Sequence, residues 1–167
     1  FLAYATEAVT GFGAAVVVVT LGAHFYPIDE LVPVLVLLNV WVTGYIAVRY
    51  RRDIVVPLLK KRVFPFMGIG IVLGLAVFPF IRGLALKELL GLFVVLFSGR
   101  ELLSIVRTAR PRVRTLSRAK SAVIQVFAGI MHALYTTGGP LLVYSLSRVN
   151  LPKGNFRATL CAVWATL

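Results

Sequence analysis

Two short motifs inside long apolar segments carry the residue types best suited to binding a ligand. They are Thr10-Gly11-Phe12-Gly13-Ala14 and Thr136-Thr137-Gly138-Gly139-Pro140. Glycine and proline break the backbone hydrogen-bond ladder of a helix, and hydrocarbon cannot satisfy the N–H and C=O groups that are freed. Such breaks persist only inside protein or beside a water-filled cavity. Paired breaks in the two halves of a chain indicate the substrate site of a transporter, so we predict a binding site here.

The predicted site suits a small anion. A helix interrupted in mid-membrane presents N–H groups at the start of its second half, where the helix dipole is positive. Threonine hydroxyls add donors, and glycine lets the backbone approach a ligand closely. The alternative is that the glycines only permit tight helix crossing, as small residues do in membranes. The predicted substrate-binding residues of the two motifs are Thr10, Gly11, Phe12, Gly13, Thr136, Thr137, Gly138, Gly139 and Pro140.

Glu7 and His132 are the ionisable residues deep inside the apolar stretches that precede the breaks, and they lie 125 residues apart. Charged groups at bilayer depth are costly and usually face a polar interior as proton relays or ligand contacts. Histidine changes its charge near neutral pH, so His132 could help to bind an anion while Glu7 exchanges a proton with it. The alternatives are an interfacial Glu7 and a neutral, hydrogen-bonded packing histidine.

The composition indicates an integral membrane protein. Hydrophobic residues make up 59% of the 167 and the mean hydropathy is +0.91, whereas soluble domains are roughly 45–50% apolar. The net charge of +12 is concentrated, because 13 of the 18 basic residues lie in the blocks Arg49 to Arg62 and Arg100 to Lys120. Both blocks fall between apolar segments, as cytoplasmic loops do. No basic groove with stacking aromatic residues is evident, which argues against a nucleic-acid partner.

We predict an all-α fold, a polytopic transmembrane helical bundle with two internal repeats and broken helices. The chain is expected to be one transmembrane domain over residues 1–167, with a first repeat over 1–110 and an incomplete second repeat over 111–167. It starts at Phe1 without a methionine and stops inside an apolar run, so we expect a fragment trimmed at both ends. The six expected spans are Leu2–Gly22, Leu31–Val48, Val63–Ile81, Leu84–Val106, Ser121–Leu146 and Phe156–Leu167.

The charge pattern predicts that the loop carrying Asp29 and Glu30 faces outward and that both basic blocks face the cytoplasm. The loop after the fifth span is then unexpectedly basic for an outward loop, since it carries Arg148, Lys153 and Arg157. Either these residues attract an anion, which we favour, or the broken span does not fully cross. Simple counting of spans makes the two repeats parallel, whereas a re-entrant turn at one break would invert them.

The second motif and its surroundings resemble a known family. Gly138-Gly139-Pro140-Leu141-Leu142-Val143-Tyr144, then Leu151-Pro152-Lys153 and Phe156-Arg157-Ala158-Thr159-Leu160, resemble the second repeat of the sulfite exporter TauE/SafE family. The first motif, followed by a short loop with Pro27, resembles the first repeat, although Ala14 and Ala15 replace further glycines and the last spans are missing. The resemblance implies a permease for small anions, typically sulfite, sulfonates or related organic acids.

Arg157 stands in the matching Phe-Arg-Ala-Thr motif and completes the predicted substrate-binding set. A guanidinium group binds sulfite-like or carboxylate oxygens through paired donors. The alternative is an interfacial arginine whose charged head reaches the lipid headgroups. Asn39, a polar residue in the second span, suits a helix–helix hydrogen bond and the site equally well.

Enzymatic functions have little support in the sequence. The single cysteine, Cys161, excludes an internal disulfide or a cysteine metal cluster, and no metal-ligand spacing or nucleophile motif is present. We therefore predict no enzyme, no metal and no cofactor. The predicted function is secondary transport of a small anion across a bacterial-type inner (plasma) membrane. The alternatives are a proton- or cation-coupled carrier that uses Glu7 and His132, or a non-transporting scaffold. The expected partners are the anion and membrane lipid, and self-association stays open.

Overall fold

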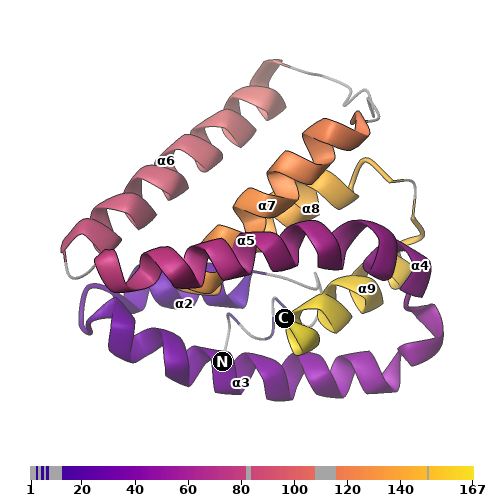
Figure 1. Ribbon diagram of the computed structural model, residues 1–167, viewed down its shortest axis with the longest axis horizontal. Coiled ribbons are helices and arrows are strands. Elements are labelled where there is room, and N and C mark those ends of the chain that lie inside the picture. The colour runs from indigo at the N-terminus through magenta and orange to yellow at the C-terminus, as the bar shows by residue number, and fades with distance from the viewer. Residues whose placement is uncertain are drawn as a thin grey trace.

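The computed structural model describes residues 3, 5, 7, 13–81, 84–107, 116–149 and 151–167, and within them it contains helices and turns but no strand (Figure 1). The all-α prediction is confirmed. The helices in chain order are α2 (Ala14–Gly22), α3 (Ile28–Arg49), η1 (Arg51–Asp53), α4 (Val56–Leu58), η2 (Leu59–Val63), α5 (Phe64–Val77), η3 (Phe78–Phe80), α6 (Leu84–Arg107), α7 (Arg118–Tyr135), α8 (Gly139–Leu146) and α9 (Lys153–Thr166).

Two stretches of the described chain are long and apolar enough to cross a membrane, Ile28–Arg49 and the 25-residue run Val56–Phe80. Only 22% of the most apolar window of each is buried inside the protein. The remaining side chains include large apolar groups at the surface, such as Trp41, which is 80% exposed. Broad apolar surfaces of this kind mark contact with a membrane or a partner.

The run Val56–Phe80 begins earlier than the sequence predicted. Val63 was expected to start a span after a loop containing Lys60-Lys61-Arg62, but these basic residues lie in the π-helical turn η2. The physical reason is Pro65, which has no N–H and whose ring clashes with the carbonyl four residues earlier. A widened turn ahead of Pro65 removes this clash and lets the helix continue.

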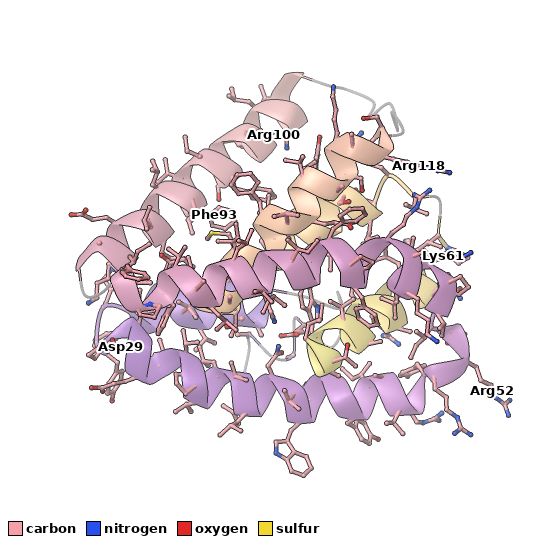
Figure 2. The ribbon with its side chains drawn as sticks, viewed as in Figure 1. Asp29, Arg52, Lys61, Phe93, Arg100 and Arg118 are labelled. Atoms are coloured by element: carbon pink, nitrogen blue, oxygen red, sulfur yellow. The ribbon has the colours of Figure 1, made fainter. Side chains whose placement is uncertain are left out.

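The two ends of the molecule differ in the charged residues that they carry. Asp29 lies at one end of α3, whereas Arg52, Lys61 and Arg118 lie at the opposite end (Figure 2). Arg148 lines the same cavity as Lys61 and Arg118. We call the end marked by these four basic residues the basic end.

The predicted fifth span is not one interrupted crossing but a helical hairpin, which corrects the expectation for Ser121–Leu146. Ser121, in the first turn of α7, has its Oγ atom 2.8 Å from Oγ of Ser145 in the last turn of α8. Gln125 Nε2 also donates to Ser145 Oγ at 3.1 Å. These contacts require α8 to run back along α7, so the chain returns to the basic end.

The hairpin explains the basic segment 148–157. The favoured prediction was an outward loop that attracts an anion. Arg148 instead lies at the basic end, as expected if the broken span does not fully cross. The start of α9 is tied to the connection after α3 at this end. Asn155 Nδ2 donates to the Asp53 carbonyl oxygen at 2.9 Å, and the Val55 N–H donates to Thr159 Oγ1 at 3.0 Å.

Helices α5 and α7 pack closely because glycines meet between them. A Cβ atom on Gly70 would lie about 3.0 Å from the Cα atom of Gly129, and one on Gly74 would lie 2.7 Å from Cβ of Ala133. The contacts advance in the same direction along both helices, so α5 and α7 run parallel from the basic end. One buried hydrophobic core joins α5, α8 and α9. It contains Met67 from α5, Leu142 from α8, and Leu160 and Val163 from α9.

Corresponding elements in the two halves begin at a constant separation. Helices α2 and α8 begin 125 residues apart (139 minus 14), as do α3 and α9 (153 minus 28). Pro27 caps α3 with φ −59° and ψ 142°, and Pro152 caps α9 with φ −56° and ψ 146°. Helix α2 leads to the Asp29 end and α8 to the basic end (Figure 1). The two half-helices therefore point in opposite directions, as the alternative with a re-entrant turn requires.

Candidate substrate site

The first turns of α2 and α8 meet at a small buried cavity. It lies beside the middle of α3, since Asn39 is 11 residues after Ile28 and 10 before Arg49. The space open to the centre of a water molecule is about 10 Å³, which corresponds to about one water molecule. The lining residues are Glu7, Gly13, Ala15, Val16, Asn39, Thr136, Thr137, Gly139 and Trp164.

Gly13 sets the start of α2. Its φ angle of 109° lies in the left-handed region, which costs a residue with a Cβ atom free energy and which glycine adopts readily. Gly13, the N-cap residue, has no side chain that could cap α2. The Glu7 carboxyl group accepts a hydrogen bond from the backbone N–H of Ala14, so an acidic side chain reaches the positive end of this half-helix.

The reversal between α7 and α8 sets the start of the second half-helix. Thr136 ends α7 in the left-handed region, with φ 55° and ψ 17°, and its hydroxyl donates to the Tyr135 carbonyl oxygen at 2.6 Å. Gly138 packs against α7 so closely that a Cβ atom there would lie 2.9 Å from Cβ of His132. Pro140 sits in the first turn of α8, where a helix has no internal acceptor for the N–H that proline lacks.

At the start of α8 the N-cap residue, Gly138, makes no side-chain hydrogen bond, whereas at the start of α2 the Glu7 carboxyl group accepts from the Ala14 N–H. The first N–H groups of a helix have no partner within that helix, and the dipole places partial positive charge there. The two half-helices point away from the cavity in opposite directions, so both N-terminal ends face it. This arrangement favours an anion between them.

Three polar side chains at the cavity have an atom without a hydrogen-bond partner among the described residues. These atoms are Glu7 Oε2, Asn39 Oδ1 and Thr137 Oγ1, on side chains of residues that are 3%, 6% and 1% exposed. A buried polar group without a partner costs free energy, so such a cluster indicates a polar ligand. The Thr137 hydroxyl can donate to an anion, and the Asn39 amide can do so after rotating by half a turn.

His132 lies behind the cavity wall rather than in it. Its ring centroid is 5.2 Å from that of Trp164, with an interplanar angle of 30°, and Trp164 lines the cavity. His132 Nδ1 is buried and has no hydrogen-bond partner among the described residues. Glu7 therefore adjoins the cavity directly, whereas His132 can influence it through the indole ring.

The structure brings together five of the predicted residues, namely Glu7, Gly13, Thr136, Thr137 and Gly139. Gly138 and Pro140 shape the reversal beside them without lining the cavity. The predicted residues Thr10, Gly11 and Phe12 lie outside the described residues.

Arg157 is not brought to the cavity. It lies near the start of α9, and its guanidinium carbon is 4.7 Å from the centre of the Tyr50 ring. Tyr50 directly follows α3, at the basic end. The arrangement in the structure therefore separates Arg157 from the threonines and glycines with which the sequence grouped it.

Three lining residues, Ala15, Val16 and Trp164, are not among the site residues predicted from the sequence. The constant separation of 125 residues would have found Trp164, because this offset relates Asn39 to Trp164, and both line the cavity. The two tryptophans of the sequence, Trp41 and Trp164, are 123 residues apart. Pairing tryptophan with tryptophan therefore misses the structural correspondence.

A helical bundle with a ligand site between opposed half-helix ends is an architecture of secondary membrane transporters. The model of the sulfite exporter TauE/SafE family matches residues 1–166. The chain belongs to this family and is a membrane permease. No curated protein and no solved structure matches it.

Proposed function

We propose that this permease moves a small anion, such as sulfite, a sulfonate or a related organic acid, and binds it in the cavity between α2 and α8. The observation that carries this proposal is that the N-terminal ends of two half-helices, α2 and α8, face one buried cavity. Each helix end contributes about half a positive charge. Membership of the TauE/SafE family supports transport rather than catalysis.

The small cavity volume supports transport through alternating states. Space for about one water molecule is too little for an anion with several oxygen atoms. Substrate binding then requires α2, α8 or their neighbours to move apart. The hairpin tip at residues 136–138 is a suitable place for this movement, because it is a short link between two helices rather than a continuous one.

We also propose that the protein crosses a bacterial-type inner membrane several times, with the basic end in the cytoplasm. This orientation follows from the positive-inside rule. It places Arg52, Lys61, Arg118 and Arg148 on one side and Asp29 on the other.

The direct test is transport by the full chain in liposomes. Vesicles loaded with radiolabelled sulfite should release it faster than protein-free vesicles, with saturation, and external sulfonates or carboxylates should compete. Release at the protein-free rate for sulfite, sulfonates and carboxylates alike would contradict anion transport and would favour a non-transporting scaffold.

A second candidate, proton-coupled transport, is favoured by Glu7. This carboxyl group is buried, lines the cavity and has one oxygen atom without a partner among the described residues. An ionised carboxylate would repel an anion bound beside it, so anion binding would favour a protonated Glu7. His132, behind Trp164, could exchange the proton.

This coupling predicts that Glu7→Gln abolishes sulfite accumulation driven by a proton gradient. The variant should retain exchange of internal for external sulfite, because glutamine preserves size and hydrogen bonding. Gradient-driven accumulation by Glu7→Gln at the unmodified rate would rule out Glu7 as the coupling group.

A further inference from the structure

A second, larger cavity opens at the basic end beside the base of the α7–α8 hairpin. The space open to the centre of a water molecule is about 790 Å³. We call it the basic vestibule. Its described lining residues are Lys61, Arg62, Phe66, Leu116, Arg118, Ala119, Ser121, Ala122, Gln125, Ser145, Arg148 and Val149.

The charge of the basic vestibule has one sign. Lys61 and Arg62 come from η2, Arg118 from the start of α7, and Arg148 from the segment after α8, and none of the described lining residues is acidic. The Arg148 guanidinium carbon is 5.0 Å from the centre of the Tyr144 ring, a contact that restricts its position. A concave surface lined by cations raises the local concentration of anions.

The floor of the basic vestibule is polar and buried. Gln125 is 1% exposed, and its Nε2 donates to Ser145 Oγ at 3.1 Å while Ser145 and Ser121 share a hydrogen bond of 2.8 Å. Gln125 Oε1 has no partner among the described residues. An amide in this setting is costly unless a polar ligand or water completes its hydrogen bonds. Rotation of the amide would turn its N–H groups toward such a ligand.

The two cavities lie on the same hairpin. The vestibule contacts its base at Ser121 and Ser145, and the inner cavity contacts its tip at Thr137 and Gly139. Six residues of α8 separate Ser145 from Gly139, a rise of about 9 Å. One short helix therefore connects the basic, open surface with the closed site.

We propose that the basic vestibule is a second anion-binding site that holds a small oxyanion at the basic end before it reaches the inner cavity. Arg118 and Lys61 supply charge, and Gln125 with Ser121 supplies hydrogen bonds from the floor. The step to the inner cavity rests on the proposed function, whereas anion binding in the vestibule does not depend on it.

The test counts bound anions on the purified full chain with radiolabelled sulfite. A Trp41→Phe background makes Trp164 the one tryptophan of the 167 residues, so its fluorescence reports the inner cavity. Arg118→Gln should raise the dissociation constant of one of two sulfite sites by about 10-fold or more and leave the Trp164 titration unchanged. Gln125→Leu should act in the same direction.

Arg52→Gln is the matched control, because it removes a positive charge from the same end but lies outside the vestibule. Equal losses in Arg52→Gln and Arg118→Gln, or an unchanged sulfite count in both Arg118→Gln and Gln125→Leu, would overturn the proposal. Added phosphatidylglycerol should leave the sulfite bound. Displacement by this lipid would overturn the proposal by assigning the vestibule to lipid phosphate.

A transport assay separates a failure of the vestibule site from a failure of the proposed anion transport. If liposomes show no sulfite flux but Arg118-dependent binding remains, anion transport fails and the vestibule site stands. If sulfite flux is normal and sulfite binding is insensitive to Arg118 and Gln125, the vestibule site fails and transport stands.

Discussion

The hydroxyl oxygens of Ser121 and Ser145 lie 2.8 Å apart, although 24 residues separate them in the chain. A continuous helix of that length would hold them about 36 Å apart. Their contact therefore fixes the base of a hairpin whose tip, at residues 136–138, reaches the cavity shared with α2. The contact also places the end of α8, and with it the start of the segment that leads to α9, at the basic end.

The hairpin makes a prediction about sidedness in the membrane. In a background with Cys161 replaced by alanine, Lys153→Cys and Arg52→Cys should react with an impermeant thiol reagent from the same side. Asp29→Cys should react only from the other side, because Asp29 lies at the opposite end of α3 (Figure 2). Labelling of Lys153→Cys from the Asp29 side would mean that α7 and α8 cross the membrane as one span.

Crowding the start of α8 should impair transport. Gly139→Leu places a branched side chain at a cavity with space for about one water molecule, so we expect at least about a 10-fold loss of sulfite affinity, measured by efflux from liposomes. Gly91→Leu is the control, since a Cβ atom on Gly91 would have no described atom within 4 Å. Equal activity of the two variants would show that Gly139 does not border the substrate.

A ligand-binding hydroxyl and a structural hydroxyl should respond differently to removal. Thr137→Val deletes a buried oxygen without a partner among the described residues. We expect a gain in unfolding free energy of about 1 kcal/mol and a loss of anion affinity of about 10-fold. Thermal unfolding and sulfite binding in detergent measure these two quantities.

Thr159→Val is the comparison, because Thr159 Oγ1 accepts the Val55 N–H at 3.0 Å. Removing this acceptor should lower the unfolding free energy by about 1 kcal/mol and leave affinity unchanged. A Thr137→Val protein that loses stability but binds sulfite normally would identify the Thr137 hydroxyl as structural.

His132→Gln should flatten the pH dependence of transport. Glutamine keeps a hydrogen bond but cannot gain a proton, whereas imidazole can bind and release one. The effect should reach the anion through Trp164, whose ring lies 5.2 Å from that of His132, with Glu7 as the titratable group on the cavity side. Initial rates of sulfite efflux across pH 5.5 to 8.5 measure it, and an unchanged profile would make His132 a packing residue.

Much of the fold could be predicted from the sequence, because apolar length and loop charge act locally. The second expected span, Leu31–Val48, agrees with α3 (Ile28–Arg49) within three residues. The glycine and proline signals likewise marked the break between α7 and α8, which lies at residues 136–138. They could not give the direction of the chain after the break, because a straight continuation and a reversal require the same residues.

The candidate site was predicted in part for a related reason. Gly13, Thr137 and Gly139 were found because a helix break is visible in one segment. Trp164 and the Gln125–Ser145 pair depend on which helices become neighbours, and a single sequence does not contain that information locally. The positive charges of Arg148 and Lys153 did indicate the hairpin. A basic loop is unexpected on the outward side, and a reversal of the chain between α7 and α8 places this loop on the cytoplasmic side instead.

The π-helical turn at Leu59–Val63 sets the rotational phase of everything that follows it in the chain. One residue of an α-helix corresponds to a rotation of about 100°, and a π turn holds one residue more than an α turn. Deleting one residue from this turn would turn Lys61 and Arg62 by about that angle relative to the glycine face of α5 that meets α7. The extra residue thus sets the rotation between the two parts of this continuous helical run. Because of it, Lys61 and Arg62 face the vestibule while the glycines of α5 face α7.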